Sequence, residues 1–301
     1  MPLQTPVDVL DPSLRDSLET LAESADEPPA IVSLSDIHGY LRAARSALLT
    51  LADRPETDPV VEADDKGRLH WANNNYILVF NGDLVDRGPA NEGVLELVGR
   101  LLREAPSGRV RVTLGNHEAI LLGRDRFGFT NWYSGRIDDA GRRQYCEAIT
   151  SGYVVAAYEG YAVSYVHAGS PDPYDVTTLN DSLIEAATAL EDAIGTQQDL
   201  PVQRRLSAAY PDVLGVGEPR LKGPDAGVLW LHFEHLPADA PPQVVGHTRY
   251  DNPQTKGSVY CQNVIQNNIE SPGGEAVFLE TPTTLSAYIR QPDGGVAKQI
   301  L

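Results

Sequence analysis

Short apolar runs that end in residue types able to bind metals recur along this chain. Residues 76–80 are rich in β-branched and aromatic types, and Asp83, Asp86 and Arg87 follow the Asn-Gly step at 81–82. This pattern predicts a buried strand that delivers a charged loop. Ligands of α/β proteins bind at the carboxyl ends of strands, so these three residues are candidates for function, although Asp83 taken alone could simply cap the next helix.

Four more runs share this arrangement. The runs and the candidate residues after them are 31–35 with Asp36 and His38, 110–114 with Asn116 and His117, 162–166 with His167, and 243–245 with His247. Five such strands are improbable by chance. We therefore expect the polar residues that follow all five strands to converge on one site.

Other segments show helical or alternating spacing. Helices are predicted over residues 40–52, 89–104 with Pro89 in the first turn, 179–194 and 202–209. A hairpin is predicted over 153–166, and a second, antiparallel sheet from the runs 258–261, 264–267, 276–279 and 285–289. The polar segment 54–75 is predicted to be an inserted surface loop.

The length of 301 residues permits one large α/β domain or two small ones. We expect a single catalytic domain over residues 30–301, because the candidate residues from 36 to 247 must meet. Residues 1–29 are acidic, and Leu14, Leu18 and Leu21 follow a helix start signal at 11–13. This segment is predicted to be an N-terminal helical extension outside the main sheet.

The charge balance is strongly acidic, with 42 Asp and Glu residues, 24 Lys and Arg residues and a net charge of −18. A carboxylate-rich, lysine-poor surface resembles those of halophilic proteins, because screening at high salt makes self-repulsion tolerable. Such a surface gains no counterion release from nucleic acid or anionic lipid. Neither nucleic acid nor a membrane is expected as a partner.

Cysteine usage and the amino-terminal sequence indicate a reducing, cytoplasmic location. Cys146 and Cys261 are the two cysteines and form no Cys-x-x-Cys motif, so neither a disulfide framework nor a thiolate zinc site is expected. The amino terminus lacks a basic region followed by an apolar core, and no apolar run approaches ~18 residues.

Arginine and aromatic residues concentrate between residues 123 and 143. The set comprises Arg124, Arg126, Arg136, Arg142 and Arg143 with Phe127, Phe129, Trp132 and Tyr133. In so acidic a chain, this cluster could form a rim that draws an anionic substrate toward the site. It could equally be a solvated helical face with a few core aromatics, and the sequence leaves both interpretations open.

Taken in order, the five motifs resemble the motif set of the calcineurin-like metallophosphoesterases. They are Asp36-x-His38-Gly39, the segment 82–88, Gly115-Asn116-His117-Glu118, His167-Ala168-Gly169 and Gly246-His247-Thr248. The match is closest to the phosphoprotein-phosphatase branch, which also includes the symmetrical dinucleoside tetraphosphatases. The resemblance implies an α/β fold in which a two-sheet β-sandwich is flanked by helices.

The resemblance also implies a pair of metal ions. Asp36, His38 and Asp83 would hold the first ion, and Asp83, Asn116, His167 and His247 would hold the second. Carboxylate, imidazole and amide donors suit manganese, which we expect, and also iron, zinc, cobalt or nickel. A hydroxide that bridges the two ions would attack phosphorus in line, without a covalent enzyme intermediate.

Further roles follow from the same resemblance. His117 would protonate the leaving oxygen while Asp86 orients its ring, and Arg87 would bind two phosphate oxygens beside Asn116. Glu118 is expected to cap or support the helix that follows.

The chain also departs from the family pattern at several positions. Ser35 stands where the first motif usually begins with Gly, and residues 229–233 replace the Leu-Trp-Ser-Asp-Pro motif of eukaryotic protein phosphatases. Their second phosphate-binding arginine therefore has no secure counterpart, and we place Arg249 in that role by its proximity to His247. The spacing of His232 and His235 could suit a metal, and their role stays open.

Three functions are weighed. The leading hypothesis is a dinuclear-metal phosphomonoesterase similar to Ser/Thr protein phosphatases, acting on a phosphoprotein. The second is hydrolysis of a dinucleoside tetraphosphate or another nucleotide or small phosphoester, with Trp132 and Tyr133 near the base. The third is a non-catalytic phosphate-binding scaffold that has kept the fold.

Overall fold

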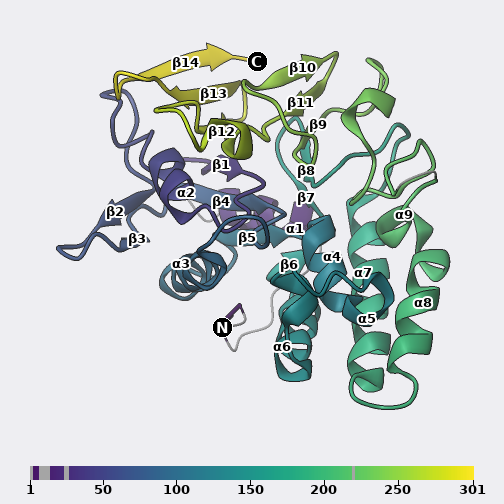
Figure 1. The fold of residues 1–301 in the computed structure, drawn as a ribbon. Coiled ribbons are helices and arrows are strands. Elements are labelled where there is room, and N and C mark those ends of the chain that lie inside the picture. The colour runs from purple at the N-terminus through teal and green to yellow at the C-terminus, as the bar shows by residue number, and fades with distance from the viewer. Residues whose placement is uncertain (1–2, 7–13, 24–26, 219–220) are drawn as a thin grey trace.

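A computed structural model describes residues 3–6, 14–23, 27–218 and 221–301, and it shows two β-sheets packed against each other with helices outside them (Figure 1). The seven-stranded sheet has the order β14 (Val296–Ile300), β13 (Leu285–Arg290), β12 (Ala276–Glu280), β1 (Ala30–Leu34), β4 (Tyr76–Asn81), β5 (Val110–Thr113), β6 (Val154–Val155). The five-stranded sheet has the order β10 (Gln254–Lys256), β11 (Val259–Cys261), β9 (Gln243–Val245), β8 (Ser164–Val166), β7 (Ala157–Glu159). The predicted two-sheet α/β fold is confirmed.

The strands that carry the five motifs are parallel neighbours within their sheets. Strand β4 pairs with β1 and β5 in parallel, and β9 pairs in parallel with β8. Every residue of β4 is buried, as expected for an apolar run covered on both faces. The Asn81 side chain joins the two sheets, because its Nδ2 donates to the carbonyl oxygens of Val166 and Val244. The carboxyl ends of these strands therefore lie close together.

Helices cover the outer faces of the two sheets. They are α1 (Leu14–Glu23), α2 (Leu41–Leu48), α3 (Asn91–Glu104), α4 (Asn116–Leu122), α5 (Arg124–Phe127), α6 (Asp139–Thr150), α7 (Val176–Ala193), α8 (Asp199–Ala209), α9 (Pro211–Leu214) and α10 (Ile265–Asn268), with 3-10 turns at Ser134–Arg136 and Phe233–His235. Helices α2 and α3 contact the larger sheet, while α7 contacts β7 and packs between α6 and α8 (Figure 1). No helix among the described residues is long and apolar enough to cross a membrane.

Two helices begin or end inside their predicted ranges. Helix α3 begins at Asn91 rather than Pro89, because the Gly88 and Ala90 amides donate to the carbonyl oxygens of His38 and Gly39 and tie this segment to the first motif. Helix α2 ends at Leu48, four residues early. There the Thr50 hydroxyl donates to the Ala47 carbonyl oxygen, a local bond that competes with continued helix.

Several strand predictions were wrong about the sheet or the element. Strands β12 and β13 extend the larger sheet, where β12 is antiparallel to β1, and the run 264–267 falls mostly in helix α10. The predicted loop 54–75 contains a hairpin of β2 (Val61–Ala63) and β3 (Leu69–Trp71). The first arm of the hairpin predicted over 153–166 is divided, since β6 pairs with β5 in the larger sheet and only β7 pairs with β8.

The structure describes only part of the predicted amino-terminal helical extension, residues 1–29. The helix start signal at 11–13 lies outside the described residues, whereas α1 is present, contacts β7 and buries Leu18. The division into an extension and one domain stays a prediction.

Candidate active site

The loops after the five motif strands meet at one place. The candidate metal-binding residues Asp36, His38, Asp83, Asn116, His167 and His247 are all buried. Neighbouring pairs lie within reach of a shared ion: His38 Nε2 is 3.5 Å from Asp83 Oδ2, His167 Nε2 is 3.2 Å from Asn116 Oδ1, and His247 Nδ1 is 2.8 Å from that same oxygen. The predicted convergence of residues from both sheets is therefore present.

Strained backbone marks the same loops. Asp36, His38, Asp83, Asp86, Arg87 and His247 have φ angles between 48° and 73°, in the left-handed region. Leu221 is the one other described non-glycine residue with positive φ. Such conformations cost about 1–3 kcal/mol each and persist only where surrounding contacts enforce them, which is typical of functional sites.

The Glu118 side chain makes many of the contacts that hold the Asp83 loop in this conformation. Its buried carboxylate accepts hydrogen bonds from the amides of Asp83 (2.9 Å), Leu84 (2.9 Å), Val85 (3.3 Å) and Gly115 (3.1 Å). Burial and the nearby Asp83 charge raise the pKa of Glu118 to about 7. The residue expected to support helix α4 thus also fixes the loop that carries Asp83.

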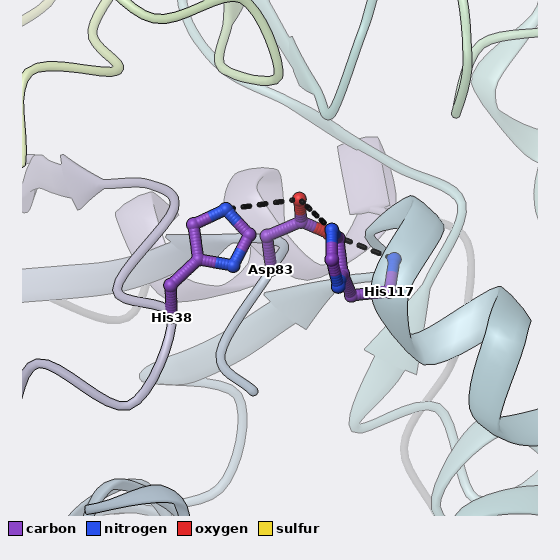
Figure 2. A group of neighbouring side chains, drawn as sticks. All are labelled: His38, Asp83 and His117. Carbon is purple, nitrogen blue, oxygen red and sulfur yellow. Dashed lines mark hydrogen bonds and ion pairs between the residues drawn. The ribbon is translucent and has the colours of Figure 1, made fainter. Parts of the chain in front are cut away.

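The Asp83 carboxylate is the centre of the cluster. Figure 2 shows the rings of His38 and His117 on either side of it. Its Oδ2 lies 3.5 Å from His38 Nε2, 3.4 Å from His167 Nε2 and 4.0 Å from His117 Nε2. Three imidazole nitrogens at distances longer than good hydrogen bonds around one oxygen form a donor set that suits cations between them.

Hydrogen bonds outside the cluster orient two of the rings. His38 Nδ1 lies 3.0 Å from the Val85 carbonyl oxygen, and His167 Nδ1 lies 3.1 Å from that of Asn81, so Nδ1 is the protonated donor and each Nε2 faces Asp83. Metal-binding histidines are commonly held this way. Burial lowers the pKa of His38 to about 3, which leaves its ring neutral and able to act as a ligand.

The buried carboxylates of the cluster are stabilised by nearby positive charge. Burial raises the pKa of Asp36 to about 6. Burial also disfavours the Asp83 carboxylate, yet the charges of His167 and His117 outweigh this and hold its pKa well below the usual value. His167 responds in the opposite sense: burial lowers its pKa, but Asp83 and Asp36 raise it to about 9. A bound cation would stabilise the ionised carboxylates in the same way.

Two overlapping groups of residues could each hold a metal ion. One is His38, Asp83 and His117, and the other is Asp83, His167 and His247. Burial keeps the pKa of His247 well below its usual value, and its buried Nε2 has no hydrogen-bond partner among the described residues. Neutral imidazoles, carboxylates and the Asn116 amide oxygen fit divalent cations that accept oxygen and nitrogen ligands. Asp36 lies beside the first group, with Oδ1 3.8 Å from His38 Nε2.

His117 is held between Asp86 and a tryptophan. Its Nδ1 lies 2.6 Å from Asp86 Oδ2, and the Ser134 amide and hydroxyl donate to the two Asp86 oxygens at 2.8 and 2.6 Å. The Trp132 ring stacks on the imidazole with centroids 4.7 Å apart. The remaining nitrogen, Nε2, lies 3.3 Å from Arg87 Nη2. Since Asp86 holds Nδ1, Nε2 beside Arg87 is the ring nitrogen that can act on a bound molecule.

A cavity of about 190 Å³ opens over the cluster. Besides candidate residues already named, it is lined by Ile120, Phe129, Trp132, Leu221, Lys222, Trp230 and Gln266. Arg87, Lys222 and Arg249 place three cationic side chains on its wall. No sequence motif indicated a site role for Lys222, Trp230, Gln266 or Ser134. Lysine is so rare in this chain that Lys222 could have been singled out, whereas the others carried no signal.

Comparisons with known proteins agree with this geometry. A family model described as calcineurin-like phosphoesterase matches residues 30–213, more than half of the chain. The chain belongs to the calcineurin-like phosphoesterase family. This confirms the resemblance that the motifs indicate, and the predicted metal-dependent phosphoric ester hydrolase is the class of enzyme that the family name describes.

Two kinds of relative resemble this phosphoesterase. "Shewanella-like protein phosphatase 2" of Arabidopsis thaliana is 27% identical over 117 residues, which are 38% of this chain and 27% of that protein, so the chain spans about a quarter of its curated relative. Crystal structures of a cold-active protein tyrosine phosphatase share the fold. One has a TM-score of 0.58 at 18% identity over 91% of this chain and 78% of that chain. Another, from a psychrophilic Shewanella species, has a TM-score of 0.55 at 17% identity over 91% and 80%.

Most arginines of the segment 123–143 do not face the cavity of this phosphoesterase. Arg142 is fully buried and pairs with Asp199, Arg124 pairs with Asp139, and Arg143 donates to the Ile194 carbonyl oxygen. Phe129 and Trp132 do line the cavity. The arginines therefore bind the helices together, and the aromatic residues are the part of the segment next to the site.

His232 and His235 lie apart from the cluster. Each has a ring nitrogen 3.7 Å from Glu234 Oε1, and His232 Nδ1 accepts a hydrogen bond from the Glu234 amide. Among the described residues neither belongs to a candidate metal group. The structure gives them a local role in the turn at Phe233–His235.

Proposed function

We propose that the protein is a phosphomonoesterase that uses two divalent cations, with Mn²⁺ as the expected ion and a phosphorylated protein as the expected substrate. The observation that carries this proposal is that Asp83 belongs to both candidate metal groups, so its carboxylate can serve two ions at once. Asp36 and His38 would complete one set, and Asn116, His167 and His247 the other. When bound, the cations supply Lewis acidity that lowers the pKa of a water and neutralises charge on the phosphoryl group.

The chain's own residues bind the phosphoryl group and supply the proton. The Arg87 guanidinium is exposed at the cavity and offers two parallel donors to phosphoryl oxygens. In hydrolysis a P–O bond to water forms and the ester P–O bond breaks. His117 Nε2 gives its proton to the leaving oxygen, and Asp86 holds the ring through Nδ1 and stabilises its charged form.

The expected substrate is a phosphoserine or phosphothreonine protein, in line with the motif resemblance and with a curated relative named as a protein phosphatase. Phe129 and Trp132 on the cavity wall favour a second candidate, a dinucleoside polyphosphate whose base contacts these aromatic side chains. Turnover of a phosphoserine peptide, a phosphotyrosine peptide and diadenosine tetraphosphate with Mn²⁺ at one enzyme concentration separates these possibilities.

We extend two sequence predictions in the same way. Residues 30–301 are proposed to be one catalytic domain, because the metal-binding residues come from both sheets. A reducing, cytoplasmic location is proposed because Cys146 and Cys261 are both free and buried.

The test of the proposed function is Mn²⁺-dependent hydrolysis of phenyl and p-nitrophenyl phosphate at high salt. His117→Ala should lower kcat on phenyl phosphate by about 10²–10⁴-fold, and less on p-nitrophenyl phosphate, whose leaving group needs less protonation. Asp83→Asn should weaken Mn²⁺ binding by more than the about 10–100-fold that loss of an outer hydrogen-bond partner of a metal ligand costs, measured by calorimetry. His70→Ala, in hairpin β2–β3, is the matched control and should behave as wild type.

Two results would contradict this account. Equal losses on both esters in His117→Ala would remove the proton-donor role. No hydrolysis with any divalent cation, while inorganic phosphate still binds, would favour the non-catalytic scaffold.

A further inference from the structure

Lys222 occupies a position that the family motifs do not account for. It lies between helix α9 and Trp230, on the wall of the cavity above the metal-binding cluster, and its side chain is half-buried. The residue before it, Leu221, also lines the cavity and has a φ of 67°, so its backbone is in the left-handed region. In the described part of the chain, no hydrogen bond or ion pair engages the Lys222 ammonium.

The other lysines have different surroundings. Lys256 Nζ donates to the carbonyl oxygens of Phe233, Glu234 and Leu236. Lys298 Nζ lies over the Tyr288 ring, and Lys66 is exposed in hairpin β2–β3. In a chain with a net charge of −18, an ammonium that lines a cavity and forms no close ion pair or hydrogen bond with a described carboxylate is suited to an anion that arrives from outside.

The charges around Lys222 point to where that anion sits. Asp83 and Asp36 attract the ammonium, whereas Arg87 and Arg249 repel it. Once cations occupy the cluster, the two carboxylates are neutralised, and among the described residues the positive side chains of Arg87, Lys222 and Arg249 remain around one cavity. An anion with high charge density at the centre of this cavity relieves their mutual repulsion.

We propose that Lys222 is the second phosphate-binding cation and makes the site prefer the dianion of a phosphomonoester over the monoanion of a phosphodiester. The proposal rests on the proposed phosphomonoesterase function. Arg249, the residue assigned to this role from the sequence, is exposed at the rim, whereas Lys222 is half-buried and has the Asp83 charge among its electrostatic partners. We place Arg249 in an outer position.

The preference follows from the number and charge of the phosphoryl oxygens. A phosphomonoester dianion has three non-bridging oxygens, whereas a diester has two and a single charge. Arg87 can hold two oxygens with its planar fork, and the third is left for the point charge of Lys222. A diester places an ester oxygen there, which accepts weakly from an ammonium.

The experiment compares Lys222→Met, Lys222→Arg and the control Lys66→Met on two substrates. At a pH where the monoester is a dianion, Lys222→Met should lower kcat/KM for p-nitrophenyl phosphate on the order of 10- to 100-fold. The value for bis(p-nitrophenyl) phosphate should change little. Lys222→Arg should recover most of the loss, and Lys66→Met should match wild type. In calorimetry of the Mn²⁺-loaded protein, inorganic phosphate should bind Lys222→Met more weakly by a similar factor.

Each remaining outcome has a defined meaning. Equal losses on the two substrates, or unchanged phosphate affinity in Lys222→Met, would overturn the assignment while the phosphomonoesterase function stands. If wild type hydrolyses neither ester, the proposed function fails, and the phosphate titration alone then supports or overturns the role of Lys222.

Discussion

Gly115 and Gly246 leave no room for a side chain beside the two carboxylates of the candidate site. A Cβ at Gly115 would lie 2.2 Å from the Asp83 amide nitrogen and 2.3 Å from Asp83 Oδ1, and one at Gly246 would lie 2.2 Å from Asp36 Oδ2. Real Cβ atoms do not approach other atoms so closely, so a substitution must displace the carboxylate. The motif glycines thus act through close packing against the candidate metal-binding residues.

Gly115→Ala is therefore expected to inactivate the enzyme through the position of Asp83. A shift of about 1 Å in a catalytic group costs on the order of 10²-fold in rate. We expect a loss of this size in kcat for p-nitrophenyl phosphate, with weaker Mn²⁺ binding and an unchanged far-ultraviolet circular dichroism spectrum. Gly295→Ala, at an exposed turn where a Cβ comes no closer than 3.1 Å to Asp293 Oδ1, is the control. Normal Mn²⁺ affinity in Gly115→Ala would contradict the argument.

Among single residues, those that belong to a short contiguous sequence motif were predictable from the sequence. Asp83, His117 and His247 each lie within four residues of the end of a strand, so local pattern alone placed them at a sheet edge. Lys222 and Ser134 reach the site through loops whose path depends on tertiary packing, and no local spacing indicated them.

Among the elements, helices α6 and α8 are joined by a buried ion pair. Arg142 donates from both terminal nitrogens to the two Asp199 oxygens at 2.7 Å, and its Nε donates to the Leu122 carbonyl oxygen at the end of α4. Burial opposes ionisation of Asp199, but the hydrogen bonds from Arg142 and Gln203 outweigh it and hold its pKa well below the usual range. The pair therefore links helices α6 and α8 to the end of α4, next to the segment that carries Phe129 and Trp132.

Asp199→Asn should destabilise the protein in a pH-dependent way. Loss of one partner of a buried pair costs about 3–5 kcal/mol in unfolding free energy. The lowered pKa of Asp199 means that its contribution is full above the unfolded value, about pH 4, and is lost as the pH falls below it. Urea unfolding should show a gap between wild type and Asp199→Asn that is constant from pH 6 to 8 and narrows toward pH 3. Exposed Asp192→Asn on α7 is the control, and a gap independent of pH would exclude this mechanism.

The type of an element was predictable where the spacing of apolar residues was regular. The sheet to which each strand belongs was not predictable. The apolar runs of β12 and β13 gave strands correctly, yet pairing of β12 with β1 depends on contacts across most of the chain. Similarly, β6 and β7 look continuous in sequence. They separate because the Asn180 side chain accepts the Ala156 and Ala157 amides, which draws the chain over to the second sheet.

For the whole molecule, the dominant electrostatic fact is the net charge of −18. The excess of carboxylates over basic side chains produces a net repulsion that favours the unfolded chain. Salt shortens the screening length from about 10 Å at 0.1 M to about 3 Å at 1 M. We expect the Tm to rise over this range of NaCl, measured by calorimetry. Sorbitol of equal osmolality is the control, and an equal rise with sorbitol or none with NaCl would argue against charge repulsion.

The place of β12 beside β1 also has a consequence for how the protein is made. Strand β1 emerges from the ribosome early, while the strand that covers one of its edges and the histidine at position 247 are translated much later. During synthesis the early strands therefore expose an open edge, the kind of surface on which aggregation begins. Chaperone demand should consequently be highest just before the carboxyl-terminal strands are released, and slowing translation over that stretch should lower the yield of folded protein.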